Sequence, residues 1–89
     1  MTEGESIRLA ELDEGERAVV SGLELPEAVA ERLMCLGFIP GVEVVAGKSA
    51  PGGDPRVFCV DGGHVALRRE TSQRISGLRL VANAEGDEP

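Results

Sequence analysis

Three side chains that can bind a metal ion fall within six residues of the sequence: Cys59, Asp61 and His64. A thiolate, a carboxylate and a neutral imidazole together suit a borderline divalent ion such as Fe(II) or Zn(II). A turn at Gly62-Gly63 would form a two-residue hairpin, with all three side chains on one face, Asp61 opposite His64 and Cys59 diagonal to it. Because no fourth donor is evident, we expect weak Fe(II) or Zn(II) binding at most, and no required cofactor.

Residues for catalysis are few. The 89 residues include one His and no Tyr or Trp. No GxxxxGK[ST] phosphate-binding loop is present, and no nucleophile stands beside a plausible base. We therefore expect one non-enzymatic domain, since this length allows little more.

The negative charge is concentrated at the two ends of the chain. Nine Lys and Arg against sixteen Asp and Glu give a net charge of −7. Five of the acids lie outside residues 7–81, which leaves eleven acids against nine bases and a net charge of −2 for the body. Nucleic-acid binding requires clustered basic residues, so the sequence argues against a nucleic-acid partner.

The cysteines and the hydropathy pattern bear on cellular location. No basic cluster is followed by an apolar run, and no stretch approaches the ~20 apolar residues of a membrane span. We expect a cytoplasmic protein that is not embedded in a membrane, with Cys35 and Cys59 as reduced thiols.

Five short strands are predicted, with residues 1–6 and 82–89 as disordered acidic tails around a domain at 7–81. The strands are expected at 17–23, 42–46, 56–60, 64–68 and through Leu78 and Leu80, after a short helical turn at 70–74. A bulge at Gly77 is expected to bring Ile75 onto the same face as Leu78 and Leu80. Five strands in so short a chain suggest a closed sheet without free edges.

A single longer helix is predicted between the first two strands, from residue 26 to 36, with Gly37 as its stop. Leu25, Val29, Leu33 and Leu36 recur at helical spacing and are expected to face the core.

Three ordered motifs carry a resemblance to a known family. They are Arg32-Leu33-Met-Cys-Leu36-Gly37-Phe-Ile-Pro40-Gly41, then Ala50-Pro51-Gly-Gly53-Asp54-Pro55, then Gly62-Gly-His-Val-Ala66-Leu67-Arg68. In this order and spacing they resemble the FeoA family of bacterial ferrous-iron uptake, over roughly residues 7–81. The resemblance implies a small SH3-like barrel of five strands with one inserted helix and a short terminal helical turn. It also implies a non-catalytic subunit that binds the cytosolic side of the FeoB GTPase-permease and modulates its activity.

The chain departs from the family pattern after Leu67-Arg68. The family pattern usually continues with two variable residues and then glutamate and alanine, whereas this chain has Arg69-Glu70-Thr71-Ser72. Gly77 stands where a β-branched residue is usual.

We assign a structural role to one group of residues and a partner-binding role to another. Turn and loop geometry is assigned to Gly37, Pro40, Gly41, Pro51, Gly53, Asp54, Pro55 and Gly62, with Asp54 expected to accept backbone N–H groups of its own loop. Contact with the permease is assigned to the helix and the loop after it, through Ala30, Leu33, Met34, Phe38 and Ile39, because one helix on a small barrel cannot bury all its sides.

Two further alternatives stay open. Val57, Cys59 and Ala66, on the outer side of the hairpin, are candidates for a second contact patch or a homodimer seam. The chain could instead be a metal-responsive regulatory domain related to the C-terminal SH3-like domain of iron-dependent repressors, which would require saturable metal binding. A generic SH3-like peptide groove is disfavoured, because two Phe are the only aromatic residues.

Overall fold

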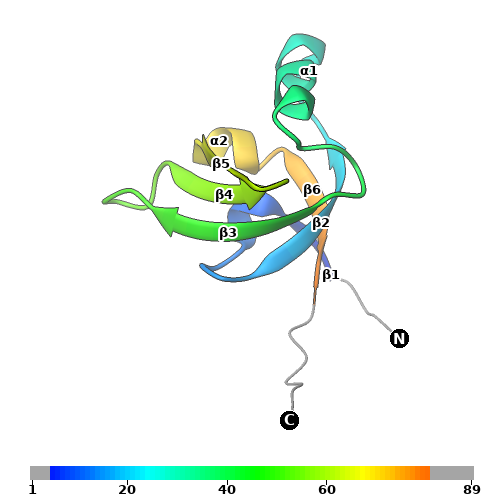
Figure 1. The fold of residues 1–89 in the computed structure, drawn as a ribbon. Coiled ribbons are helices and arrows are strands. Elements are labelled where there is room, and N and C mark those ends of the chain that lie inside the picture. Colours follow the sequence, from blue (N-terminus) through cyan, green and yellow to red (C-terminus); the bar gives the residue numbers. More distant parts are fainter. Residues whose placement is uncertain (1–4, 81–89) are drawn as a thin grey trace.

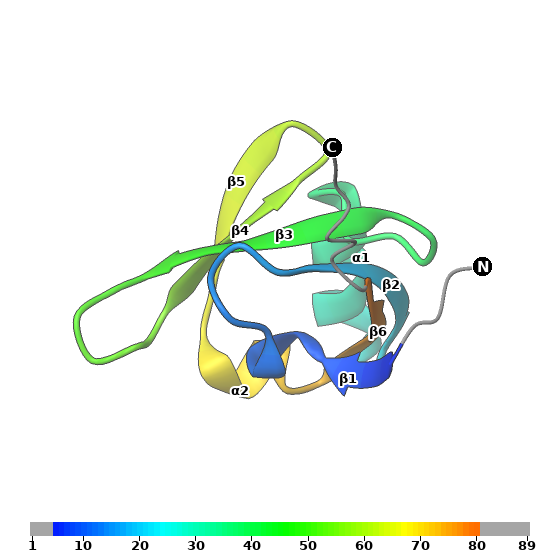
Figure 2. The same cartoon turned by 90° about the horizontal axis from the view of Figure 1, so that it is seen from below.

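The computed structural model describes residues 5–80, which form one bent sheet with two helices. All strand pairs are antiparallel, in the order β1-β6-β2-β3-β4-β5 (Figure 1). The elements are β1 (Glu5–Arg8), the 3-10 turn η1 (Leu9–Glu11), β2 (Arg17–Leu23), α1 (Glu27–Cys35), β3 (Glu43–Ser49), β4 (Arg56–Val60), β5 (Gly63–Leu67), α2 (Arg69–Ser72) and β6 (Ile75–Arg79). Seen from below, the strands curve around a common interior, with α1 and α2 as separate short elements (Figure 2).

The predicted mainly β fold is confirmed, with six strands instead of five. The sixth is β1, which begins at Glu5 and thereby corrects the expected tail at residues 1–6 for positions 5 and 6. It was missed because its partner, β6, lies at the far end of the sequence: Glu5 pairs with Arg79. The expected tail at 82–89, like residues 1–4, lies outside the described residues.

Closure of the sheet, as expected from the strand count, is not found among residues 5–80. Strands β1 and β5 stand at the two ends of the strand order and do not pair with each other. The sheet therefore keeps two edge strands.

The β4–β5 hairpin has the predicted faces but a different register. The turn is Asp61-Gly62, where Asp61 has φ 50° and Gly62 φ 81°, so Cys59 pairs with His64 and Phe58 with Val65. Because the shift is two residues, every side chain stays on its expected face. An aspartate that adopts the left-handed conformation needed by this turn explains the difference.

Strand β6 contains no bulge, which corrects the expectation at Gly77. Ile75 and Gly77 face inward and Leu78 is exposed, while the irregularity lies between Val20 and Gly22 of β2. A Cβ atom at Gly77 would lie 2.8 Å from the backbone oxygen of Val19, so glycine is required by this close approach.

The interior is a single apolar cluster to which all six strands, η1, α1 and two loop residues contribute. Its buried members are Ile7, Leu9, Leu12, Ala18, Val20, Leu33, Phe38, Val44, Ala46, Phe58, Val60, Leu67 and Ile75. Both aromatic residues are fully buried, so the two largest side chains of the chain are at its centre.

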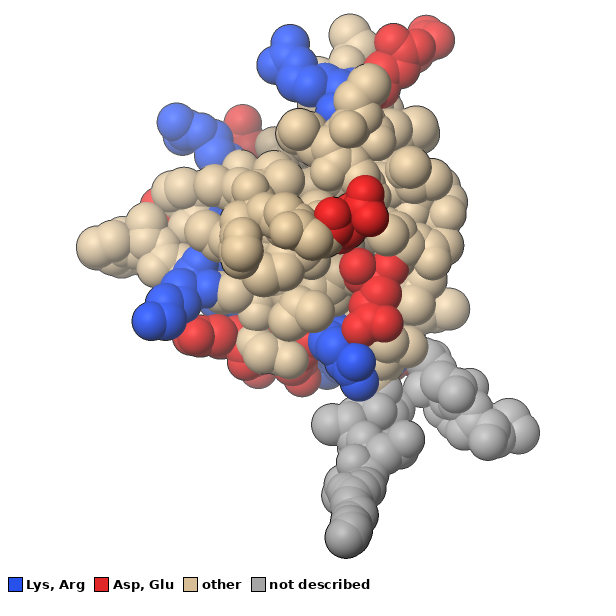
Figure 3. Space-filling model, viewed as in Figure 1, with Lys and Arg blue, Asp and Glu red and all other residues tan. Residues whose placement is uncertain are grey.

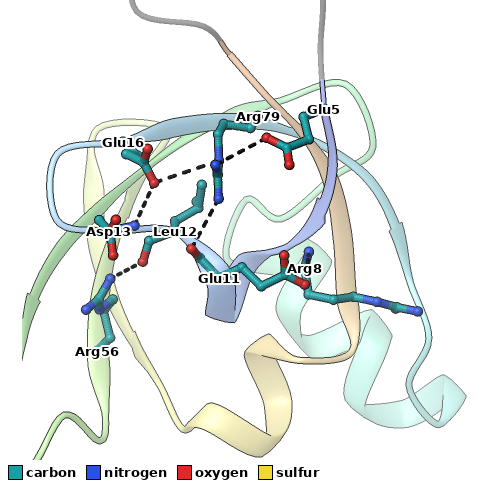
Figure 4. Close-up of polar contacts among 8 residues, drawn as sticks. All are labelled: Glu5, Arg8, Glu11, Leu12, Asp13, Glu16, Arg56 and Arg79. Atoms are coloured by element: carbon teal, nitrogen blue, oxygen red, sulfur yellow. Dashed lines mark hydrogen bonds and ion pairs between the residues drawn. The ribbon is translucent and has the colours of Figure 1, made fainter.

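Arg79 ties the two ends of the described chain together (Figure 4). Its guanidinium donates to the carboxylate of Glu5 at 3.2 Å and to the backbone oxygen of Glu11 at 3.3 Å. Its Nε lies 3.8 Å from a carboxylate oxygen of Glu16. The side chain is 28% exposed, so these contacts are partly shielded from water and fix β1 and the turn after η1 beside β6.

Candidate functional site

Helix α1 stands at one end of the molecule, where it projects from the sheet (Figure 1). Its end is well defined: the N–H of Phe38 donates to the oxygen of Leu33 and the N–H of Gly37 to that of Met34, both at 3.0 Å. These two bonds form a Schellman motif, which needs the left-handed backbone found at Gly37 (φ 113°). The predicted helix stop is confirmed, and it fixes the direction in which the next residues leave the helix.

The helix buries only part of the predicted stripe: Leu33 is in the core and Leu25 packs against it. Only Ala30 and Leu33 of α1 are buried. Val29 and Leu36, both expected in the core, are 39% and 47% exposed. The prediction was wrong for Val29 and Leu36, because spacing along a helix shows which residues share a face, but not how much sheet is available to cover that face.

The predicted contact residues divide into two classes. Ala30, Leu33 and Phe38 are buried and can act only as supports. Met34 and Ile39 are exposed, as are Val29 and Leu36, which we had not assigned to contact. We call the four exposed residues, Val29, Met34, Leu36 and Ile39, the α1 surface.

Geometry places the α1 surface on both flanks of the helix. Val29 and Leu36 are seven residues apart and share one flank, whereas Met34 is about 140° away from Val29. Ile39 follows in the loop. A hollow adjoins the first flank; it is lined by Leu25 and Val29, by Glu70 and Thr71 of α2, and by Arg74 just after α2. Charged side chains of both signs project from this end of the molecule, so no single charge dominates it (Figure 3).

The loop at residues 50–55 is tied to α2 by Asp54. Its carboxylate accepts the backbone N–H of Arg69 at 3.0 Å, at the start of α2. The loop's own shape is held by backbone bonds, from Ala50 to the oxygen of Pro55 and from Gly53 to that of Ala50. The expectation that Asp54 serves its own loop is thus corrected.

The three candidate metal ligands are only partly brought together. Cys59 and His64 are directly paired across the hairpin, while Asp61 is in the turn. Cys59 and His64 line a hollow on the outer face, together with Val45 and Val57 and with the charged residues Glu14 and Lys48. Within residues 5–80 no group of three His, Cys, Asp or Glu is arranged to hold a metal ion. Two donors leave a tetrahedral site half filled, so these residues do not by themselves fit zinc or iron.

Comparison with known proteins identifies the family. The FeoA domain family model matches residues 7–77. The chain belongs to the FeoA domain family. A solved FeoA protein from Chlorobium tepidum is 32% identical, with a TM-score of 0.81 over 86% of this chain and 73% of that one. A FeoA protein from Stenotrophomonas maltophilia, solved in complex with zinc and named a procaryotic SH3 domain protein, is 36% identical with a TM-score of 0.69, covering 80% and 88% of the two chains. These likenesses confirm the predicted SH3-like fold.

A curated relative links the family to ferrous-iron transport. It is an Fe(2+) transport protein A/Fe(2+) transporter FeoB fusion protein from Porphyromonas gingivalis, 31% identical over 78 residues. These residues are 88% of this chain but only 9% of the fusion protein, so the chain spans about a tenth of that relative's length. Among residues 5–80, no helix is long and apolar enough to cross a membrane.

Proposed function

We propose that this protein is a non-catalytic accessory subunit of ferrous-iron uptake, which binds the cytosolic side of a FeoB-type GTPase-permease and modulates its activity. The observation that carries the proposal is the α1 surface. Four large apolar side chains, 39–51% exposed, lie on a projecting helix and the loop after it, and none of them belongs to the buried core cluster.

Exposed apolar residues on one projecting element favour a protein partner, because water contact with them is unfavourable and burial against a partner removes it. The Porphyromonas gingivalis fusion protein supports FeoB as that partner, since it joins a FeoA relative to FeoB in one chain. Ala30, Leu33 and Phe38 then act as the buried anchor that holds the α1 surface in place.

Binding of the chain to the isolated cytosolic domain of the FeoB-type permease tests the proposal. Met34→Glu and Ile39→Asp each place a charge on the α1 surface without touching a buried residue. We expect each to weaken binding at least about tenfold, because burying a charge against an apolar partner costs more than about 1.4 kcal/mol.

Leu78→Asp is the matched control, since Leu78 is 42% exposed but lies on β6. It should leave binding unchanged. The GTP hydrolysis rate of the permease domain, measured with and without each variant, reports modulation separately from binding. Unchanged binding of both α1 variants, or equal weakening by Leu78→Asp, would show that the α1 surface is not the contact.

A further inference from the structure

Among residues 5–80, no second strand pairs with the outer side of β5, so one row of its backbone hydrogen-bonding groups has no partner there. It is the last strand in the sheet order, and β4 is its one partner within the described part of the chain. In a two-residue hairpin the pair that flanks the turn, here Val60–Gly63, is hydrogen-bonded, and non-hydrogen-bonded and hydrogen-bonded pairs alternate from there. Cys59–His64 is therefore a non-hydrogen-bonded pair and Phe58–Val65 a hydrogen-bonded one. The N–H and C=O groups of His64 and Ala66 therefore point away from β4, toward the open edge.

The two edges of the sheet differ in how well they resist pairing with another strand. Edge strands are commonly protected by charged residues or proline. Strand β1 carries Glu5 and Arg8, both held in ion pairs. Strand β5, Gly63–Leu67, has no Lys, Arg, Asp, Glu or Pro. The face of the molecule over β4 and β5 is largely uncharged (Figure 3).

We propose that two copies of this chain associate through β5, antiparallel about a two-fold axis at Val65. In this register His64 of each copy lies opposite Ala66 of the other, and the outward N–H and C=O groups form four hydrogen bonds across the axis. The half-buried Val65, already packed on the core cluster, meets Val65 of the second copy. The two sheets join into one.

Charge complementarity favours a second copy of this chain as the partner of β5. The turn before β5 carries Asp61, and the strand is followed by Arg68 and Arg69. Antiparallel pairing about Val65 brings Asp61 of each copy alongside Arg68 and Arg69 of the other. None of these three side chains has an ion-pair partner within residues 5–80. The dimer thus forms two such charge pairs at once.

A pair of five-residue strands buries less area than the roughly 1,200 Å² at the low end of stable complexes, so we expect a weak, reversible dimer that forms only at high protein concentration. Sedimentation equilibrium up to about 1 mM protein should show a reversible dimer in the wild type. Amide exchange by NMR should slow at His64 and Ala66 as the concentration rises. A wild type that is monomeric throughout this range would overturn the proposal.

Ala66→Pro removes an outward N–H that β4 does not use, and thus blocks the edge selectively. It abolishes two of the four hydrogen bonds across the axis, so we expect dimerisation to weaken roughly thirtyfold. Ala66→Thr keeps the N–H and is the control. Equal dimerisation of the two variants would exclude β5 as the seam.

A crosslink tests the register even if Ala66→Pro fails to fold. In a background of Cys35→Ser and Cys59→Ser, Val65→Cys should form a disulfide dimer under mild oxidation, since the residues of a central non-hydrogen-bonded pair lie within disulfide reach. Ser21→Cys, exposed on β2, is the control and should crosslink no faster than random collision. Equal crosslinking of both variants would refute pairing at Val65. The α1 surface shares no residue with β5, so either proposal can fail without the other.

Discussion

Gly77→Ala tests whether the close approach of β2 and β6 sets the identity of this residue. The added Cβ would lie 2.8 Å from the backbone oxygen of Val19, and the nearest side-chain atom, the Cβ of Ala18, is 3.6 Å away. Both strands are interior to the sheet, so neither can move aside freely. Overpacking of this kind costs about 1–3 kcal/mol, and alanine regains about 0.5–1 kcal/mol because glycine is more flexible in the unfolded chain. We expect a net loss of about 1–2 kcal/mol in the free energy of unfolding.

Thermal and urea unfolding, followed by far-UV circular dichroism because the chain has no Trp, measure this loss. The melting temperature should fall by roughly 5–15 °C. Gly22→Ala is the matched control: it lies on β2 of the same strand pair, and its Cβ would meet only the Ser76 hydroxyl, at 3.5 Å. This control should be neutral or slightly stabilising. If Gly77→Ala is as stable as Gly22→Ala, close packing does not explain the glycine.

Three other predictions concern the loop, the N-terminal strand and the metal candidates. Asp54→Ala should lower the free energy of unfolding by about 1 kcal/mol, because it removes the acceptor for the Arg69 N–H, while Asp54→Asn, which keeps an acceptor, should lose less in urea unfolding. Arg79→Met should speed amide exchange in β1 by removing the bond to Glu5; Arg17→Met, which breaks only the exposed pair with Glu43, should leave β1 unchanged. Calorimetric titration with Zn(II) should be the same for the wild type and His64→Ala, because the hairpin pairs only two donors; a saturable site that the variant loses would contradict this.

The sequence was most informative where the signal is local. Strands β2 and β4 have the predicted bounds, 17–23 and 56–60, and α1 is within one residue at each end. Alternation gave the correct faces of the β4–β5 hairpin even though its register was off by two. Turn residues and alternation act over a few positions, so a single sequence displays them directly.

Prediction failed where the answer depends on distant partners. Glu5 and Ser6 look like a polar tail until β6 pairs with them. Val29 and Leu36 look like core residues until the small extent of the sheet leaves them uncovered. Met34 and Ile39 were correctly expected on the surface, but Phe38 lies in the core because the Schellman turn directs it inward. Each of these errors concerns tertiary contact, which local pattern does not record.

The position of β6 between β1 and β2 has a consequence for how the chain acquires its structure. Strands β2 to β5 follow one another along the sequence and can pair as they emerge from the ribosome. Strand β1 must wait for a partner synthesised last: the contact between Glu5 and Arg79 spans 74 positions. Such non-local pairing slows folding, because the entropy cost of closing a long loop comes before the stabilising contacts form. Strand β1 can therefore join the sheet only after β6 has been made, and residue 79 must be translated before the domain can finish folding.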